Sequence, residues 1–147
     1  MPDNKTEIRA SFSAVRWHDS ELIDMHLVRI PNELRYDLSL DLNLITGYTK
    51  DGPEMSRHTA LFRGCRIIKA DFDLLGVLVC GGAIASGTCY TEALEFARRN
   101  ASKAPELDFP EIHNPLEECV GFLFEMINPG GEMIVCAQDF QLHKTLS

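Results

Sequence analysis

The chain lacks the short motifs that reveal common cofactor and nucleophile chemistry. It has no GxGxxG dinucleotide fingerprint, and Gly82–Thr88 has the glycine spacing of a phosphate-binding loop without its lysine. The GxSxG nucleophile elbow also fails around Ser86, because Ile84 and Thr88 take the glycine positions. We therefore expect no cofactor, assign no catalytic residue, and favour a protein that is not an enzyme.

Metal-site and disulfide spacings are missing as well. The five cysteines are an odd number, widely spaced and without a CxxC pair, and the five histidines form neither HxH nor HExxH. We expect no metal site, and reduced thiols typical of an intracellular protein. A cysteine–histidine nucleophile, for instance Cys89 with His113, stays formally open, but nothing in the sequence brings such a pair together.

Basic residues and long apolar runs are scarce. Fourteen lysines and arginines against twenty-two acidic residues leave a net charge of −8, which repels phosphate backbones and argues against nucleic-acid binding. The acidic surface either suits a basic protein partner or simply keeps a small domain soluble. The longest nearly unbroken apolar run, Leu74–Ala85, is shorter than the about 20 residues of a membrane span. With no apolar segment in the first ten residues, we expect a cytoplasmic protein without membrane contact.

The clearest pattern that is present is RYDLSLDLNLIT, residues 35–46. Tyr36 and four leucines occupy every second position and alternate with polar residues, which predicts a strand with one buried and one solvent-facing side. Glu21–Ile30 predicts the strand before it, with Ile23, Met25 and Leu27 towards the core. Because only a short turn joins the two strands, they are expected to be antiparallel.

The remaining segments complete a mainly β pattern. A loop is expected at Gly47–Arg57, and Gly76–Gly87 reads either as a buried strand with a glycine turn or as a loose connection. Thr91–Asn100 is the best helix, with Glu95 and Arg99 spaced to pair. The other expected strands are a weak one at Ser11–Trp17, His58–Phe62 with Gly64 marking a bulge before the strand continues, Cys119–Ile127, and Glu132–Phe140.

These elements predict an α+β fold: a mainly antiparallel β-sheet of about six strands, flat or curled, with one principal helix. The length of 147 residues favours one domain. We expect a disordered N-terminal tail at 1–10, a globular domain at 11–143 and a short C-terminal tail at 144–147.

Four residues are candidates for a binding site. His18 beside Asp19 is suited to orienting an imidazole for metal or acid–base chemistry, although a turn capped by Asp19 or Ser20, with His18 as a partly buried hydrogen-bonding residue, explains the pair more simply. Asp139, in the final hairpin, is a candidate pocket carboxylate, with a solvated strand face as its ordinary explanation. The candidate set is Trp17, His18, Asp19 and Asp139.

The segment Trp17–Leu22, the FRGC segment at Phe62–Cys65 and the glycine hairpin that leads to AQDF at Ala137–Phe140 resemble small bacterial β-rich proteins. Among these is the fiftieth immunity-protein family of polymorphic toxin systems. The resemblance implies a compact α+β domain that neutralises a toxin by binding it, and it implies no catalytic residues.

Three hypotheses follow. The first is a non-enzymatic domain that binds a protein partner, in the immunity reading a basic toxin. The second is a small-molecule or metal-binding protein, or a small enzyme, with a pocket near His18 and Asp19. The third is a homodimer joined through an edge strand.

Overall fold

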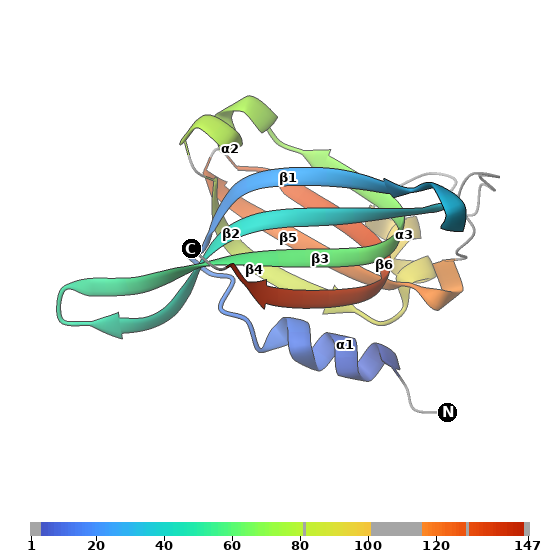
Figure 1. Cartoon of the computed structure of the whole chain (residues 1–147), viewed down its shortest axis with the longest axis horizontal. Helices are drawn as coiled ribbons and strands as arrows, with labels where there is room; N and C mark the ends of the chain where they lie inside the picture. Colours follow the sequence, from blue (N-terminus) through green and yellow to red (C-terminus); the bar gives the residue numbers. More distant parts are fainter. Residues whose placement is uncertain (1–3, 81, 101–115, 129, 146–147) are drawn as a thin grey trace.

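Figure 1 shows the computed structural model of the chain, in which residues 4–80, 82–100, 116–128 and 130–145 are described. Six antiparallel strands form a closed barrel in the order β1-β2-β3-β6-β5-β4, and β4 pairs back onto β1. The strands are β1 (Glu21–Ile30), β2 (Arg35–Thr49), β3 (Gly52–Asp71), β4 (Gly82–Tyr90), β5 (Val120–Asn128) and β6 (Glu132–Lys144). The helices are α1 (Asn4–Ser13), α2 (Leu74–Cys80) and α3 (Ala93–Asn100), with 3-10 turns η1 (Pro31–Glu33) and η2 (Leu116–Glu118). The predicted fold class is confirmed, and the sheet is curled to closure.

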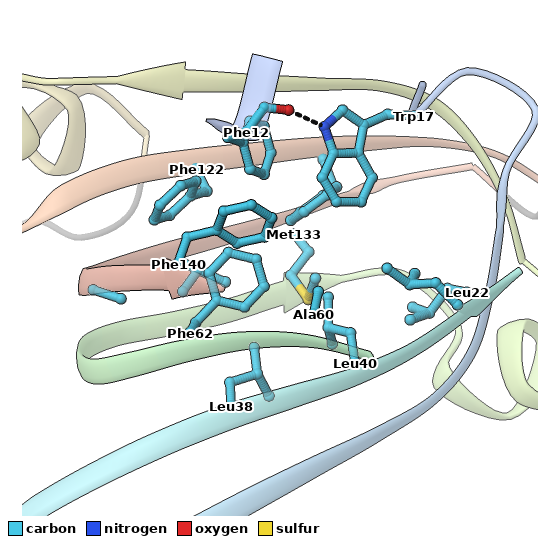
Figure 2. Close-up of a cluster of buried hydrophobic side chains, with 14 of the residues drawn as sticks. Phe12, Trp17, Leu22, Leu38, Leu40, Ala60, Phe62, Phe122, Met133 and Phe140 are labelled. Carbon is cyan, nitrogen blue, oxygen red and sulfur yellow. Dashed lines mark hydrogen bonds between the residues drawn. The ribbon is translucent and has the colours of Figure 1, made fainter. Parts of the chain in front are cut away.

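The barrel interior is filled by side chains. Leu38, Leu40, Leu42 and Leu44 of β2 are all buried, which confirms the predicted alternation over the four leucines, whereas Asp37, predicted to face solvent, is 5% exposed. Opposite them lies an aromatic cluster, shown in Figure 2, in which neighbouring ring centroids lie 4.7–6.2 Å apart. Its members are Phe12, Trp17, Phe62, Phe122, Phe124 and Phe140. Burial of each such ring stabilises the fold by about 1.5–3 kcal/mol.

The N-terminal region differs from the prediction. Residues 4–10 of the expected disordered tail and the weak strand expected at Ser11–Trp17 are instead α1 and a turn that leads into β1, and residues 1–3 lie outside the described chain. Ile8 and Phe12, one helical turn apart, are both buried, and α1 contacts β4, β5 and β6. Figure 1 shows α1 along the lower side of the barrel. Sequence analysis misses this helix because its apolar face is only one residue wide. Such a helix is stabilised mainly by packing against the barrel, which the local sequence does not reveal.

Strand β1 also departs from the expected face. Its pairing with β2 shifts between Leu22 and Asp24, so Ile23 is the extra residue of a β-bulge. The inward-facing residues of β1 therefore include Leu22 and Met25, which pair with the buried Leu42 and Leu40. The expectation that residues 23, 25 and 27 form the core face is wrong at the start of the strand, where Leu22 and not Ile23 is buried, because a one-residue bulge changes the side-chain alternation there. Leu27, expected in the core, pairs with the buried Leu38 but is 63% exposed, and it lies beyond Glu21 and Leu22, the part of β1 that pairs with β4.

The predicted loop at Gly47–Arg57 is instead a two-stranded arm. Pairing of β2 with β3 continues out to Thr49 and Gly52, past the ends of the neighbouring strands. In Figure 1 this hairpin projects from the barrel at the left. Gly52, at φ 121°, takes the left-handed backbone that the tight turn requires.

The ambiguous segment Gly76–Gly87 is neither of the two expected alternatives: it contains the end of α2 and most of β4. The predicted helix at Thr91–Asn100 is confirmed as α3, with Arg99 donating a 2.6 Å hydrogen bond to Glu95. The strands predicted at Cys119–Ile127 and Glu132–Phe140 are confirmed as β5 and β6. The polar stretch 102–115 lies outside the described residues.

Helix α3 packs on the outer side of the barrel. Ile134 and Cys136 of β6, which alternate with the inward-facing side chains, form a second apolar cluster with Phe96 and Ala97 of α3. Gly121 makes this approach possible, because a Cβ atom there would lie 2.4 Å from the Phe96 ring. In the described part of the chain, no helix is long and apolar enough to cross a membrane.

Candidate functional site

The predicted His18–Asp19 pair lies in the turn between α1 and β1. Asp19 is in the left-handed conformation, φ 66°, which aspartate tolerates better than most residues. Its amide donates a 2.8 Å hydrogen bond to the carbonyl oxygen of Ile84, and the amide of Ile84 donates one of 2.8 Å to the carbonyl oxygen of Ser20. These bonds fix the turn against β4.

The two side chains are exposed and adjacent. His18 Nδ1 lies 2.9 Å from the carbonyl oxygen of Ala85, and His18 Nε2 lies 3.4 Å from Asp19 Oδ2. Beneath them the fully buried Ser20 joins the turn to β2: its hydroxyl donates a 2.6 Å bond to the carbonyl oxygen of Arg16 and accepts a 3.1 Å bond from the amide of Ile45. The imidazole is therefore oriented by one backbone acceptor and one carboxylate, on a firmly anchored turn.

A cleft of about 530 Å³ opens beside this turn. The turn, Tyr48 of the β2–β3 arm and β4 form its walls, and Arg16 lies 5.8 Å from the centroid of the Tyr48 ring. Gly87 allows the Trp17 indole to lie against β4, since a Cβ atom there would be 2.7 Å from the ring. The cleft is lined by Ser13, Val15, Arg16, Trp17, His18, Tyr48, Ala85, Ser86 and Gly87.

The structure brings some of the candidate residues together and separates another. Trp17 and His18 line the cleft, with Asp19 paired to His18. Asp139 does not line it: it lies on β6 opposite Arg63 of β3. Its carboxylate accepts a 2.8 Å hydrogen bond from the amide of Phe140 and a 3.2 Å bond from Gln141. Trp17 is 3% exposed, so its ring is mainly part of the core.

The sequence does not reveal two groups of residues that the structure brings together. Arg16, Tyr48 and Ser86 line the cleft, but they come from three separate elements and share no local pattern. Asp24, His26 and Asp41 form an Asp–His–Asp cluster on β1 and β2. Strand alternation places Asp24 and His26 on one face, but Asp41 joins them only through the pairing of the two strands.

The described cysteines do not look like nucleophiles. Cys65, Cys89, Cys119 and Cys136 are buried and are not disulfide-bonded. Burial raises the pKa of the Cys89 thiol to about 12, so the thiol stays protonated near neutral pH, as in structural cysteines. His113, its formal partner, lies outside the described residues.

The fold and the cleft define a small closed antiparallel barrel with a packed aromatic interior, external helices and a projecting two-stranded arm. Comparison with protein-family models, with curated proteins and with solved structures finds no match to this chain.

Proposed function

We propose that this protein is a non-enzymatic binding domain that engages a protein partner through its β2–β3 arm. The observation that carries the proposal is the arm itself. Pairing of β2 with β1 ends at Asn43 and pairing of β3 with β6 ends at His58, whereas β2 and β3 continue together to Thr49 and Gly52. Within the described chain the outer arm thus has no flanking strand.

An arm of this kind has two features of a recognition element. Its two strand edges present backbone donors and acceptors that an extended segment of a partner can pair with. It also exposes large apolar side chains, with Tyr48 64% and Met55 38% exposed. Exposed aromatic residues are frequent anchors in protein interfaces.

A pull-down with matched variants tests the proposal. The full-length protein, the double variant Tyr48→Ser with Met55→Ser, and Ile127→Ser are immobilised and exposed to lysate of the protein's own host at low salt. Ile127 is 50% exposed but lies on β5, so it serves as an apolar surface control. We expect a protein, identified by mass spectrometry, that the wild type and Ile127→Ser retain and the arm variant loses. Equal retention by the arm variant, or no specific retention by the wild type, would contradict the proposal.

Shortening the arm provides a second variant. Replacing residues 46–54 by Asn-Gly, a favoured two-residue hairpin turn, removes the arm and leaves Ile45 and Met55, which already pair, as the residues that flank the turn, so the register of the barrel pairings is kept. We expect circular dichroism and the unfolding midpoint to change little while partner retention is lost. A large drop in the midpoint would instead show that the arm supports the barrel.

A basic toxin is the partner class we favour, with the protein acting as an immunity-type inhibitor. The net charge of −8 and the resemblance noted for residues 17–22 support this choice. Complementary charge accelerates association and makes it sensitive to salt. A retained partner with an acidic isoelectric point, or retention that is indifferent to salt, would argue against a basic toxin while leaving the arm proposal intact. A second copy of this chain is the remaining occupant of the arm, and light scattering distinguishes it by mass.

The cleft favours a second candidate function, the binding of a small polar or anionic molecule. Its volume of about 530 Å³ is within the range of ligand pockets, and Arg16, His18 and Ser86 supply donors. A thermal-shift screen of metabolites and nucleotides tests this, because a ligand at a hundred times its dissociation constant adds about 2.7 kcal/mol. A shift that His18→Ala removes, without loss of the fold, supports the cleft. A shift that persists in that variant places the ligand elsewhere.

A further inference from the structure

The outer surface of strands β1 and β2 carries a compact set of three metal-ligating side chains. His26 Nε2 lies 3.2 Å from Asp24 Oδ2 and 3.4 Å from Asp41 Oδ2. No two of these ligand atoms are more than 4.8 Å apart. We propose that Asp24, His26 and Asp41 form a binding site for a divalent transition-metal ion such as Zn²⁺, separate from the arm and the cleft.

The β-bulge at Ile23 creates this arrangement. Leu22 pairs with Leu42, and both are buried. Without the bulge, the alternation would direct Asp24 inward as well. The extra residue resets the register so that Asp24 pairs directly with Asp41 on the outer face, with His26 two residues along the same strand.

In each carboxylate one oxygen accepts a hydrogen bond from a neighbouring residue, and the other oxygen lies near the imidazole of His26. Asp24 Oδ1 accepts a 2.8 Å hydrogen bond from the amide of Met25. Asp41 Oδ1 accepts a 3.3 Å bond from the hydroxyl of Thr59 on β3. The two Oδ2 atoms are the ones near His26 Nε2. Donors that hold the non-ligating oxygens are a usual support of metal sites.

The two distances from His26 Nε2 to the carboxylate oxygens, 3.2 and 3.4 Å, are close to those between neighbouring ligands of one metal ion. Zinc bonds of 2.0–2.2 Å in a tetrahedron separate neighbouring ligand atoms by about 3.3–3.6 Å. An imidazole with two carboxylates suits Zn²⁺, Mn²⁺ or Co²⁺ better than Ca²⁺ or Mg²⁺, which prefer oxygen alone. Three protein ligands leave a position for water on the solvent side.

Charge also favours a cation here. Asp24 and Asp41 are directly cross-strand, and like charges in that position destabilise a sheet. A single imidazole N–H can direct its proton fully at only one carboxylate at a time, whereas a dication contacts both carboxylates and the Nε2 lone pair together. The side chains are 46%, 55% and 31% exposed for Asp24, His26 and Asp41, so an ion can enter without opening the barrel.

Calorimetric titration of the chelator-treated full-length protein with Zn²⁺ tests the proposal, together with Co²⁺ absorption as a spectroscopic reporter. The wild type should bind one ion, and long-range ¹⁵N–¹H spectra should show His26 coordinating through Nε2. His26→Ala, Asp24→Asn and Asp41→Asn should each abolish this binding. Thr59→Val, which removes only the supporting hydroxyl, should weaken it by about tenfold.

His18→Ala is the matched control. His18 is also an exposed histidine 3.4 Å from a carboxylate, but only Asp19 is paired with it, so this variant should bind as the wild type does. Co²⁺ spectra without a thiolate charge-transfer band separate the site from the cysteines. The proposal fails if the wild type shows no saturable binding, if His26→Ala and Asp41→Asn keep wild-type affinity, or if His18→Ala removes the binding. All variants change exposed or half-exposed side chains, and circular dichroism verifies their fold.

Discussion

The indole Nε1–H of Trp17 donates a 2.9 Å hydrogen bond to the main-chain carbonyl oxygen of Phe12, and the two rings pack with centroids 4.7 Å apart (Figure 2). The two residues are five positions apart in the sequence, so the bond closes the turn that follows α1. Both side chains enter the aromatic cluster of the barrel interior. The pair thus attaches the N-terminal helix to the core and at the same time shapes one wall of the cleft.

Trp17→Phe should destabilise the protein by about 1–3 kcal/mol, because it removes the indole donor, leaves the Phe12 carbonyl oxygen with only the 3.2 Å hydrogen bond from the amide of Val15, and opens a cavity where the larger ring was buried. Urea unfolding followed by circular dichroism measures the change. Tyr48→Phe, which removes a hydroxyl from an exposed ring, is the control and should cost less than about 0.5 kcal/mol. Equal stability of Trp17→Phe and the wild type would show that the bond contributes nothing.

Gly121→Ala tests the packing of α3 on the barrel. The added methyl would lie 2.4 Å from the Phe96 ring, so overpacking should cost about 1–3 kcal/mol. Gly47→Ala is the matched control, since the nearest atom to its Cβ is 3.7 Å away. In a Phe96→Ala background the cost of Gly121→Ala should shrink, and a double-mutant cycle measures this coupling. Additive effects would show that the two residues do not conflict.

Three buried thiols should make the protein sensitive to alkaline pH. Burial raises the pKa of Cys65, Cys89 and Cys136 from 9.0 to about 12. Between these values the thiols ionise only in the unfolded chain, so their contribution to stability is complete below pH 9 and is lost as pH rises towards 12. Each should account for about 1 kcal/mol between pH 8 and 10.

The variant Cys136→Ala separates this effect from the titration of other groups. Its loss of stability between pH 8 and 10 should be smaller than that of the wild type by about 1 kcal/mol, whatever its stability at neutral pH. Parallel curves for the two proteins would refute a role for this thiol. Slow alkylation in the native state and rapid alkylation in urea would agree with protonated, buried groups.

The parts of the fold that sequence predicts are those in which the pattern is local. The leucines of β2 and the residues Val120, Phe122, Phe124 and Met126 of β5 occupy every second position because one face of each strand is directed towards the interior, and that alternation is visible without knowing the partners. The position of α3 is likewise marked by local helical spacing.

The parts that sequence misses depend on pairing or on distant surfaces. The bulge at Ile23 places Leu22 on the same face as Met25, and it is defined only by the register with β2. Helix α1 has two buried residues, Ile8 and Phe12, whose significance depends on a barrel formed later in the chain. The Asp–His–Asp cluster requires both the bulge and the register. The spacing of Asp24 and His26 is visible in the sequence, whereas the position of Asp41 beside them is not.

Asp37 provides a last test, away from all three candidate sites. It is 5% exposed, and its Oδ1 accepts 3.0 Å hydrogen bonds from the amide of Gly64 and from Arg35 Nε. Gly64 is held there at φ 64°, two residues before the pairing with β6 shifts. The carboxylate therefore joins β2 to the irregular part of β3.

Asp37→Ala should cost about 3 kcal/mol, because it leaves Arg35 without its buried partner and removes an acceptor from Gly64. Glu33→Ala, which removes the exposed partner of the same arginine, should cost no more than about 1 kcal/mol. Asp37→Asn keeps an acceptor oxygen, so its cost in stability should lie between those of Asp37→Ala and Glu33→Ala. Chemical unfolding of the three variants gives the ranking directly. If Asp37→Ala and Glu33→Ala were equally stable, burial of the Asp37 carboxylate would not be what makes this contact strong.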